Sequence, residues 1–134
     1  MSVESPTPLA RKLGIVSGSV LITLKKPQAL DLDLPPGVTV RTRLAGRADV
    51  VMVFVTEVRE LAARMEKLAG AISPAGGLWI AWPKKASGVS TDLTDRVVRD
   101  VVLAAGLVDN KVCAIDQTWS GLRAVWRRAD RPPS

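Results

Sequence analysis

The stretch ADVVMVFV, residues 48 to 55, constrains the fold most. Apart from Asp49 it is apolar at every position, so both of its faces must be buried, as in a central strand of a parallel sheet. The stretches SVLITL, 19 to 24, and LWIAW, 78 to 82, have the same character. Because side chains alternate along a strand, LWIAW places Leu78, Ile80 and Trp82 on one face and Trp79 and Ala81 on the other.

Two amphipathic helices are expected between and after these strands. In the first, apolar residues recur at steps of three and four from Val58 to Ile72 and form one buried stripe. Thr56 is the expected N-cap, and SPAGG, residues 73 to 77, is expected to end the helix.

The second helix has its apolar stripe between residues 93 and 105. Thr91 or Asp92 is expected to cap it, and Gly106 stands where a C-cap glycine belongs. A shorter helix is expected to begin at Pro8, with Thr7 as a possible N-cap, since proline is common at the first helical position.

Strands alternating with helices predict an α/β fold, here a single Rossmann-like domain over residues 7 to 128. Its sheet is expected to be mostly parallel, with helices on both faces. KVCAID, 111 to 116, and GLRAVWRR, 121 to 128, are joined by only four residues and predict a C-terminal antiparallel hairpin. The polar ends, 1 to 6 and 129 to 134, are expected to be flexible.

One predicted strand conflicts with this plan. VTVRTR, 38 to 43, alternates as a half-exposed strand does. Only four residues separate Arg43 from Ala48, whereas a parallel crossover needs roughly ten or more. Either the strand is antiparallel or it stops near Arg41, and the sequence leaves both options open.

The residues that the chain lacks exclude several chemistries. Its 134 residues include no His, no Tyr and only one cysteine, Cys113. The missing His argues against a zinc site, and it also excludes catalysis by the commonest general base. One cysteine cannot form an internal disulfide, and no secretory signal or membrane-length apolar run is present, so we expect a cytoplasmic protein without membrane contact. The net charge of +6 favours anionic partners or serves only solubility.

From residue 48 to 128, the order of elements resembles the second half of the class I methyltransferase fold. In that family a Pro-Gly-Gly turn precedes the fifth strand, as in SPAGGLWIAW here, and the last two strands pair antiparallel. More specifically, WIAWPKKASGVSTDLT and GLVDNKVCAIDQTWSGLR look like the small bacterial proteins of the domain-of-unknown-function family 3052. That resemblance runs through most of the chain and implies a one-domain bacterial protein with no assigned activity.

The chain departs from methyltransferases where they hold their cofactor. The resemblance implies a glycine-rich turn after the first strand, where the backbone approaches the ligand closely. Here the turn reads ITLKKPQAL, with Lys25, Lys26 and Pro27 in place of glycines, and the basic VTVRTRLAGR lacks an acid to hold a ribose. We therefore expect a methyltransferase-like architecture without a cofactor, and no binding of S-adenosylmethionine.

Ligands of open α/β sheets bind beyond the carboxyl ends of the parallel strands. This edge is expected to collect lysines and hydroxyls from several loops, together with a helix N-terminus that favours an anion. The candidate anion-binding residues are Lys25, Lys26, Lys84, Lys85, Ser87 and Thr91. The candidate pocket wall consists of Trp82, Asp116 and Trp119.

These residues also have a purely structural interpretation, which the sequence leaves open. Trp82 would then complete the core, the lysines would be solvated, and Thr91 would only cap a helix. Cys113 lies in an apolar strand and is expected to pack rather than react. Three arginines could form a basic stripe with Lys25 and Lys26, or an ordinary solvated edge, which is the preferred interpretation: Arg41, Arg43 and Arg47.

The main functional hypothesis is a non-catalytic module that binds an anionic small molecule or protein partner at the carboxyl edge. An alternative is a basic protein associated with nucleic acid, whose binding would weaken steeply with salt. A second alternative is an enzyme of unknown activity on a methyltransferase-like scaffold, working through Asp, Glu, Lys or the lone Cys.

Trp119 lies in DQTWSG, between the two strands of the predicted hairpin. An exposed indole there would be costly, so we expect Trp119 to fold against the strand ends near Trp82 and the 83 to 91 loop. As such a clasp, it should matter less for stability than Trp79 and more for the order of that loop.

Overall fold

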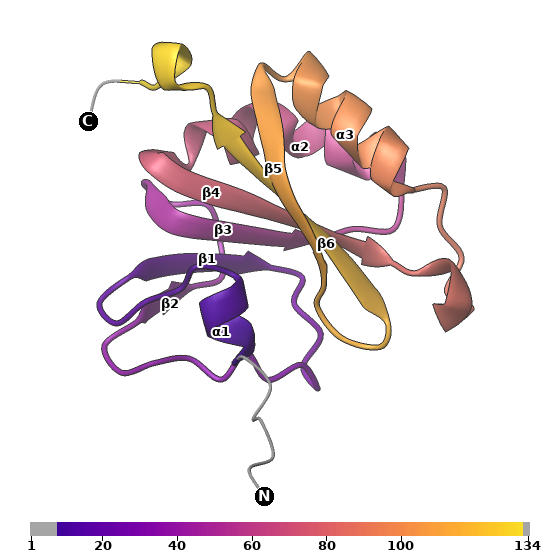
Figure 1. Cartoon of the computed structure of the whole chain (residues 1–134), viewed down its shortest axis with the longest axis horizontal. Helices are drawn as coiled ribbons and strands as arrows, with labels where there is room; N and C mark the ends of the chain where they lie inside the picture. Colours follow the sequence, from indigo (N-terminus) through magenta and orange to yellow (C-terminus); the bar gives the residue numbers. More distant parts are fainter. Residues whose placement is uncertain (1–7, 133–134) are drawn as a thin grey trace, which may run out of the picture.

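The computed structural model describes residues 8–132, which form a six-stranded sheet in the order β2-β1-β3-β4-β6-β5 (Figure 1). Strands β1 to β4 run parallel, and β6 runs antiparallel to both of its neighbours, β4 and β5. This confirms the predicted α/β class with its C-terminal antiparallel hairpin. The strands are β1 (Val20–Leu24), β2 (Thr39–Arg41), β3 (Ala48–Phe54), β4 (Ile72–Pro83), β5 (Leu107–Ala114) and β6 (Trp119–Trp126).

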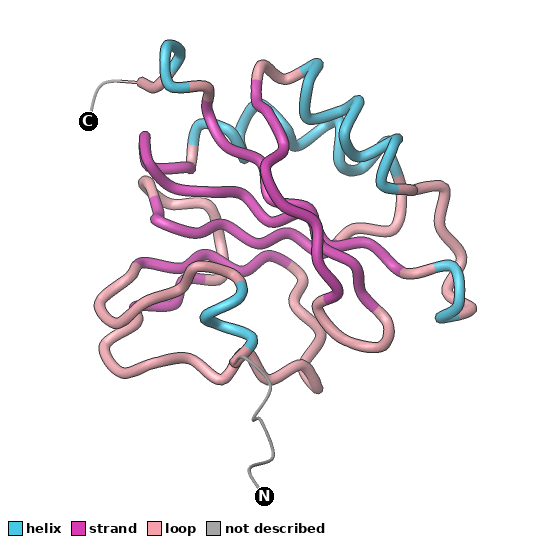
Figure 2. The backbone as a smooth tube through the Cα atoms, in the orientation of Figure 1, coloured by secondary structure: helices cyan, strands magenta, loops and turns pink. Residues whose placement is uncertain are grey.

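Helices α2 and α3 lie next to each other over one face of the sheet (Figures 1 and 2). The opposite face is covered by the short α1 and by the irregular loop between β1 and β2, which buries Leu30 and Leu32. Helices therefore lie on both faces, as expected, although the second face depends largely on a loop. The helices are α1 (Leu9–Lys12), α2 (Val58–Gly70) and α3 (Asp95–Ala104), with the 3-10 turns η1 (Lys85–Ser87) and η2 (Arg128–Asp130).

The sheet separates two hydrophobic cores. Leu78, Ile80 and Trp82 belong to the core under α2 and α3, whereas Trp79 and Ala81 belong to the core under α1. This division confirms the alternation predicted for LWIAW. In the second core the fully buried Trp79 donates from Nε1 to the carbonyl oxygen of Leu13, at 2.8 Å, and so ties β4 to the end of α1.

The conflict over residues 38 to 43 is resolved by a short parallel strand. Strand β2 pairs with β1 through Val20 with Thr39 and Ile22 with Arg41, and it stops at Arg41. All three residues of β2 are exposed, as fits an edge strand with little apolar surface to bury. Because β2 ends at Arg41, residues 42 to 47 form the connection to β3. This connection crosses from one side of β1 to the other, since β1 lies between β2 and β3 in the sheet.

Several strand boundaries differ from the sequence-based expectation. SPAGG does not form a terminating loop, because residues 73 to 77 belong to β4. There Gly76 lies so close to β3 that a Cβ would stand 2.6 Å from the Asp49 carbonyl oxygen. The hairpin is also displaced: β5 begins at Leu107, directly after Gly106, and β6 already begins at Trp119.

The N-caps of α2 and α3 were predicted wrongly. Helix α2 has Glu57 rather than Thr56 at its N-cap position, with no side-chain cap from that residue. Helix α3 is capped by Thr94, whose side chain accepts a hydrogen bond from the Val97 N–H. Gly106 does follow α3 with φ at 86°, the left-handed conformation that favours glycine after a helix end.

The remaining sequence-based expectations can be compared only with the residues that the structure describes. The end at residues 1 to 6 lies outside the described residues, whereas Ala129 and Asp130 at the other end belong to η2. Within residues 8–132, no helix is long and apolar enough to span a bilayer. The same residues contain no group of three or more His, Cys, Asp or Glu placed to hold a metal ion.

Candidate functional site

The carboxyl ends of β1, β3 and β4 meet at one edge of the sheet, together with the β5–β6 turn (Figure 1). Two backbone hydrogen bonds join these ends: Val55 N–H to the Ala81 oxygen, at 3.0 Å, and Lys84 N–H to the Thr118 oxygen, at 2.8 Å. The two lysine pairs singled out in the sequence, at 25–26 and 84–85, therefore follow strands that end at the same edge.

The first lysine pair makes internal contacts. Lys25, directly after β1, has φ at 61° and forms an ion pair with Glu60 on α2. Lys26 donates from Nζ to the carbonyl oxygens of Pro27, at 3.1 Å, and Leu30, at 2.6 Å. Both ammonium groups thus hold the loop after β1 in place, which reduces what they can offer a ligand.

The hydroxyls of the 83 to 91 loop are also used internally. Ser87 donates from Oγ to the Lys84 carbonyl oxygen, at 2.6 Å. Thr91 donates from Oγ1 to the Thr56 carbonyl oxygen, at 2.6 Å, and accepts from the Leu93 N–H. Within residues 8–132 the Nζ atoms of Lys84 and Lys85 have no hydrogen bond or ion pair, so these two ammonium groups are free at the edge.

The N-terminus of α2 is capped from a distant part of the chain. Asp92 accepts a hydrogen bond at Oδ1 from the Val58 N–H, at 2.7 Å. This carboxylate satisfies one of the free N–H groups at the helix start and complements the positive end of the helix dipole. The sequence suggested Asp92 as a cap, but for α3 instead of α2.

Replacing Asp92 by alanine is expected to destabilise the protein by about 0.5–2 kcal/mol, because the Val58 N–H loses its acceptor. Denaturant unfolding measures the loss. Ser90→Ala is the matched control in the same loop, since Ser90 is exposed and makes no hydrogen bond within residues 8–132. Equal stabilities for the two variants would show that the Asp92 cap contributes nothing.

The three residues expected to wall a pocket do not form one wall, because the Trp82 side chain lies on the opposite face of the sheet from that of Trp119. Trp82 is 5% exposed and belongs to the core under α2 and α3. Trp119 is half-buried against the other core, where it meets Phe54 edge to face with ring centroids 5.1 Å apart. Asp116 accepts at Oδ1 from the N–H groups of Thr118 and Trp119 and so shapes the hairpin turn. Trp119 does pair with Pro83, next to the 83 to 91 loop, as expected, but its indole and that of Trp82 lie on opposite faces of the sheet.

A basic hollow of about 520 Å³ lies beside the carboxyl ends of β1 and β2, between these strands and α2. We call it the carboxyl-edge hollow. Its three cations, Arg43, Arg64 and Lys67, have no hydrogen bond or ion pair within the described residues, and no carboxylate lines it. The lining residues are Leu24, Thr42, Arg43, Leu44, Ala63, Arg64 and Lys67.

Sequence patterns did not predict this hollow. The basic stripe considered for Arg43 includes Lys25 and Lys26 but neither cation of α2, and both of these stand outside the apolar stripe of the helix. Arg64 and Lys67 come to line the same hollow as Arg43 only in the folded chain, where α2 borders the ends of β1 and β2. The one available signal was the run of basic residues after β2, which lies at the edge where ligands bind in such sheets.

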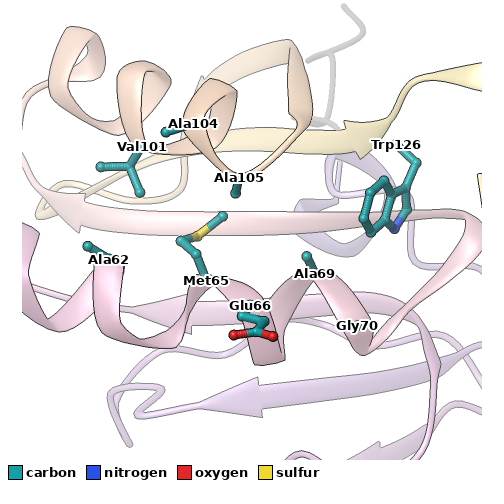
Figure 3. A pocket seen from close by; sticks show the side chains of 9 residues that line it. All are labelled: Ala62, Met65, Glu66, Ala69, Gly70, Val101, Ala104, Ala105 and Trp126. Atoms are coloured by element: carbon teal, nitrogen blue, oxygen red, sulfur yellow. The ribbon is translucent and has the colours of Figure 1, made fainter. Parts of the chain in front are cut away.

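A second, apolar groove of about 540 Å³ runs between α2 and α3 (Figure 3). Met65 and Val101 extend into it from the two helices, and the Trp126 ring closes one end. The helical stripes predicted from the sequence are wider than the sheet can cover, so Ala62, Val101 and Ala105 remain partly open. Glu66 is the only ionisable residue lining the groove, so it offers a surface for an apolar group but little acid–base chemistry.

The sequence matches no family model and no curated protein. The fold, in contrast, is similar to solved methyltransferases. Magnesium protoporphyrin IX methyltransferase from Synechocystis PCC 6803, with bound SAM, has a TM-score of 0.59 at 12% identity, over 89% of this chain and 74% of that one. A SAM-dependent methyltransferase from Aquifex aeolicus has a TM-score of 0.58 at 13% identity, over 85% of each chain.

A third neighbour is the 1,6-didemethyltoxoflavin-N1-methyltransferase of Burkholderia thailandensis, with bound S-adenosylhomocysteine. Its TM-score is 0.59 at 10% identity, over 87% of this chain and 73% of that one. At such identities the similarity defines the fold only. The protein therefore has a methyltransferase-like Rossmann fold, and the resemblance to the 3052 family stays a prediction.

Proposed function

We propose that this protein is a ligand-binding module on a methyltransferase-like scaffold, and that its ligand is an anionic small molecule held at the carboxyl edge of the sheet. The observation that carries the proposal is the carboxyl-edge hollow, where Arg43, Arg64 and Lys67 converge without a carboxylate. Three cations close together repel one another, and an anion between them relieves that repulsion. The edge is also where ligands bind in open α/β sheets.

Residues at the edge support binding rather than catalysis. The chain has no His or Tyr, and the Ser87 and Thr91 hydroxyls near the edge are engaged with backbone groups. Arginine and lysine remain charged at neutral pH, so they bind anions well but exchange protons poorly. Lys84 and Lys85 extend the positive charge along the same edge and would attract an anionic ligand over a longer range.

The second candidate is an enzyme on this scaffold, and the fold similarity supports it because neighbouring structures hold SAM or S-adenosylhomocysteine. The turn after β1 argues against that cofactor here. Lys25 keeps a left-handed φ of 61°, which a glycine would favour, yet its side chain is paired with Glu60. We therefore predict that S-adenosylmethionine does not bind.

Calorimetric titration separates the two candidates, with pyrophosphate as the anionic probe and S-adenosylhomocysteine as the cofactor probe. Arg64→Gln should weaken pyrophosphate binding about tenfold or more, because a hydrogen bond to a charged group contributes about 1.5–3 kcal/mol. Arg59→Gln is the matched control, since Arg59 is exposed on the same helix and does not line the hollow.

Equal affinities of the two variants for pyrophosphate would contradict the proposed site. Micromolar binding of S-adenosylhomocysteine would favour the enzyme and refute the argument from Lys25. A preference for single-stranded nucleic acid, with a steep loss of affinity in salt, would instead favour the alternative based on overall basic charge.

A further inference from the structure

Arg123, on β6, occupies an unusual position on the sheet. It pairs with Trp79 of β4 on one side and with Lys111 of β5 on the other. Its guanidinium lies over Gly77, where a Cβ would stand 2.5 Å from Arg123 Nε and 2.7 Å from Cζ. The absence of a side chain at Gly77 is therefore what allows the half-buried guanidinium to lie against the sheet.

Arg123 lines two adjoining hollows at the amino-terminal edge of the parallel strands, opposite the carboxyl edge. The first, of about 260 Å³, is basic and also has Arg11, Lys12 and Lys111 in its wall. The second, of about 330 Å³, is lined by hydroxyls and glycine backbone, including Ser17, Ser19, Ser73, Gly18 and Gly76. Together they form what we call the amino-edge site.

The charge of Arg123 is not compensated by any of residues 8–132. Its guanidinium makes no hydrogen bond or ion pair in the part of the chain that the structure describes. Partial burial lowers the pKa of Arg123, and no carboxylate raises it again. A charge withdrawn from water without a partner costs free energy, and that cost is offset when an anion binds.

The remaining charges at this site are arranged to admit an anion. Lys12 and Lys111 each donate one hydrogen bond to a backbone carbonyl, at 3.3 and 3.0 Å, and each keeps further N–H donors. The only carboxylate in either wall is Asp49, and its Oδ2 accepts from the Val20 N–H at 2.8 Å. Cations therefore dominate the side of the site formed by α1 and β5.

We propose that the amino-edge site binds the phosphate group of a small phosphorylated molecule, with Arg123 as its principal ligand. The planar guanidinium presents parallel N–H donors that match two phosphate oxygens. Lys12, Lys111 and Arg11 supply further positive charge, and the serine-lined hollow has room for the rest of the molecule. This site is separate from the carboxyl-edge hollow and does not depend on its function.

NMR titration with inorganic phosphate, and then with adenosine monophosphate, tests this site directly through the Nε–H signal of Arg123. We expect that signal to shift on titration and Arg123→Gln to reduce the affinity at least tenfold. Arg127→Gln is the matched control, since Arg127 is an exposed arginine outside both hollows. Arg64→Gln should leave the Arg123 shift unchanged, which separates this test from that of the carboxyl-edge hollow.

Two further variants keep the test decisive if Arg123→Gln folds poorly. Arg123→Lys retains the charge but loses the paired donors, so it should bind phosphate several-fold more weakly than the native chain. Gly77→Ala retains Arg123 but displaces its guanidinium, and it should weaken phosphate binding as well. An unshifted Arg123 signal at millimolar phosphate, or equal losses for Arg123→Gln and Arg127→Gln, would overturn the proposal. Tighter binding of single-stranded oligonucleotide than of adenosine monophosphate would contradict the small-molecule assignment.

Discussion

Trp79→Ala is expected to destabilise the protein by about 3–5 kcal/mol, the usual cost of replacing a fully buried large aromatic residue. Trp79 has no exposed surface, and its Nε1 donor satisfies the Leu13 carbonyl oxygen. The substitution leaves both a cavity beside α1 and a buried carbonyl without its donor. Urea unfolding with an unchanged m-value would measure the loss.

Trp119→Ala is the comparison variant for this prediction. Trp119 is half-buried and packs edge to face on Phe54, so its loss should cost about 1.5–3 kcal/mol, less than that of Trp79. Because Pro83 pairs with Trp119, the variant should also become more sensitive to protease at Lys84 and Lys85. Equal losses of stability for the two tryptophans, with unchanged proteolysis, would reject the role of Trp119 as a clasp on that loop.

Gly76→Ala is expected to destabilise the fold by about 1–3 kcal/mol, because the new methyl group forces a backbone shift. Its Cβ would lie 2.6 Å from the Asp49 carbonyl oxygen and 3.2 Å from that of Ala48, and neither atom belongs to a flexible side chain. This close approach lies where the pairing of β3 with β4 is irregular, between Ala48 and Val50.

Gly70→Ala is the matched control for Gly76. No atom lies within 4 Å of a Cβ at Gly70, the last residue of α2. Alanine is a better helix former than glycine, so this variant should be neutral or more stable by up to about 1 kcal/mol. A Gly76 variant as stable as the Gly70 variant would mean that β3 and β4 can separate at little cost.

The sequence predicted the sheet well because its inner strands are apolar on both faces. For β1, β3 and the LWIAW part of β4, burial leaves few alternatives, and the predicted division of tryptophans between two cores is confirmed. The prediction that SPAGG forms a loop was wrong, although proline and paired glycines usually interrupt a strand. In this chain the glycines instead permit close approaches, to β3 at Gly76 and to Arg123 at Gly77.

The candidate sites depend on long-range packing that no local pattern contains. Asp92 caps a helix that begins 34 residues earlier, so its partner could not be read from neighbouring residues. The lysines at the carboxyl edge were predicted because ligands of open α/β sheets bind at the carboxyl ends of the parallel strands. That principle does not tell which of these lysines form hydrogen bonds or ion pairs within the protein. The three cations of the carboxyl-edge hollow come from the loop after β2 and from α2, and they line one hollow only in the folded chain.

A crystal structure soaked with a mixture of nucleotides and phosphate-bearing metabolites tests the central claim most directly. We expect an anionic group in the carboxyl-edge hollow, in contact with Arg43 and Arg64, with the ion pair between Lys25 and Glu60 intact. A ligand seated over the turn after β1 with that ion pair broken, or bound ligand elsewhere with the hollow empty, would contradict it.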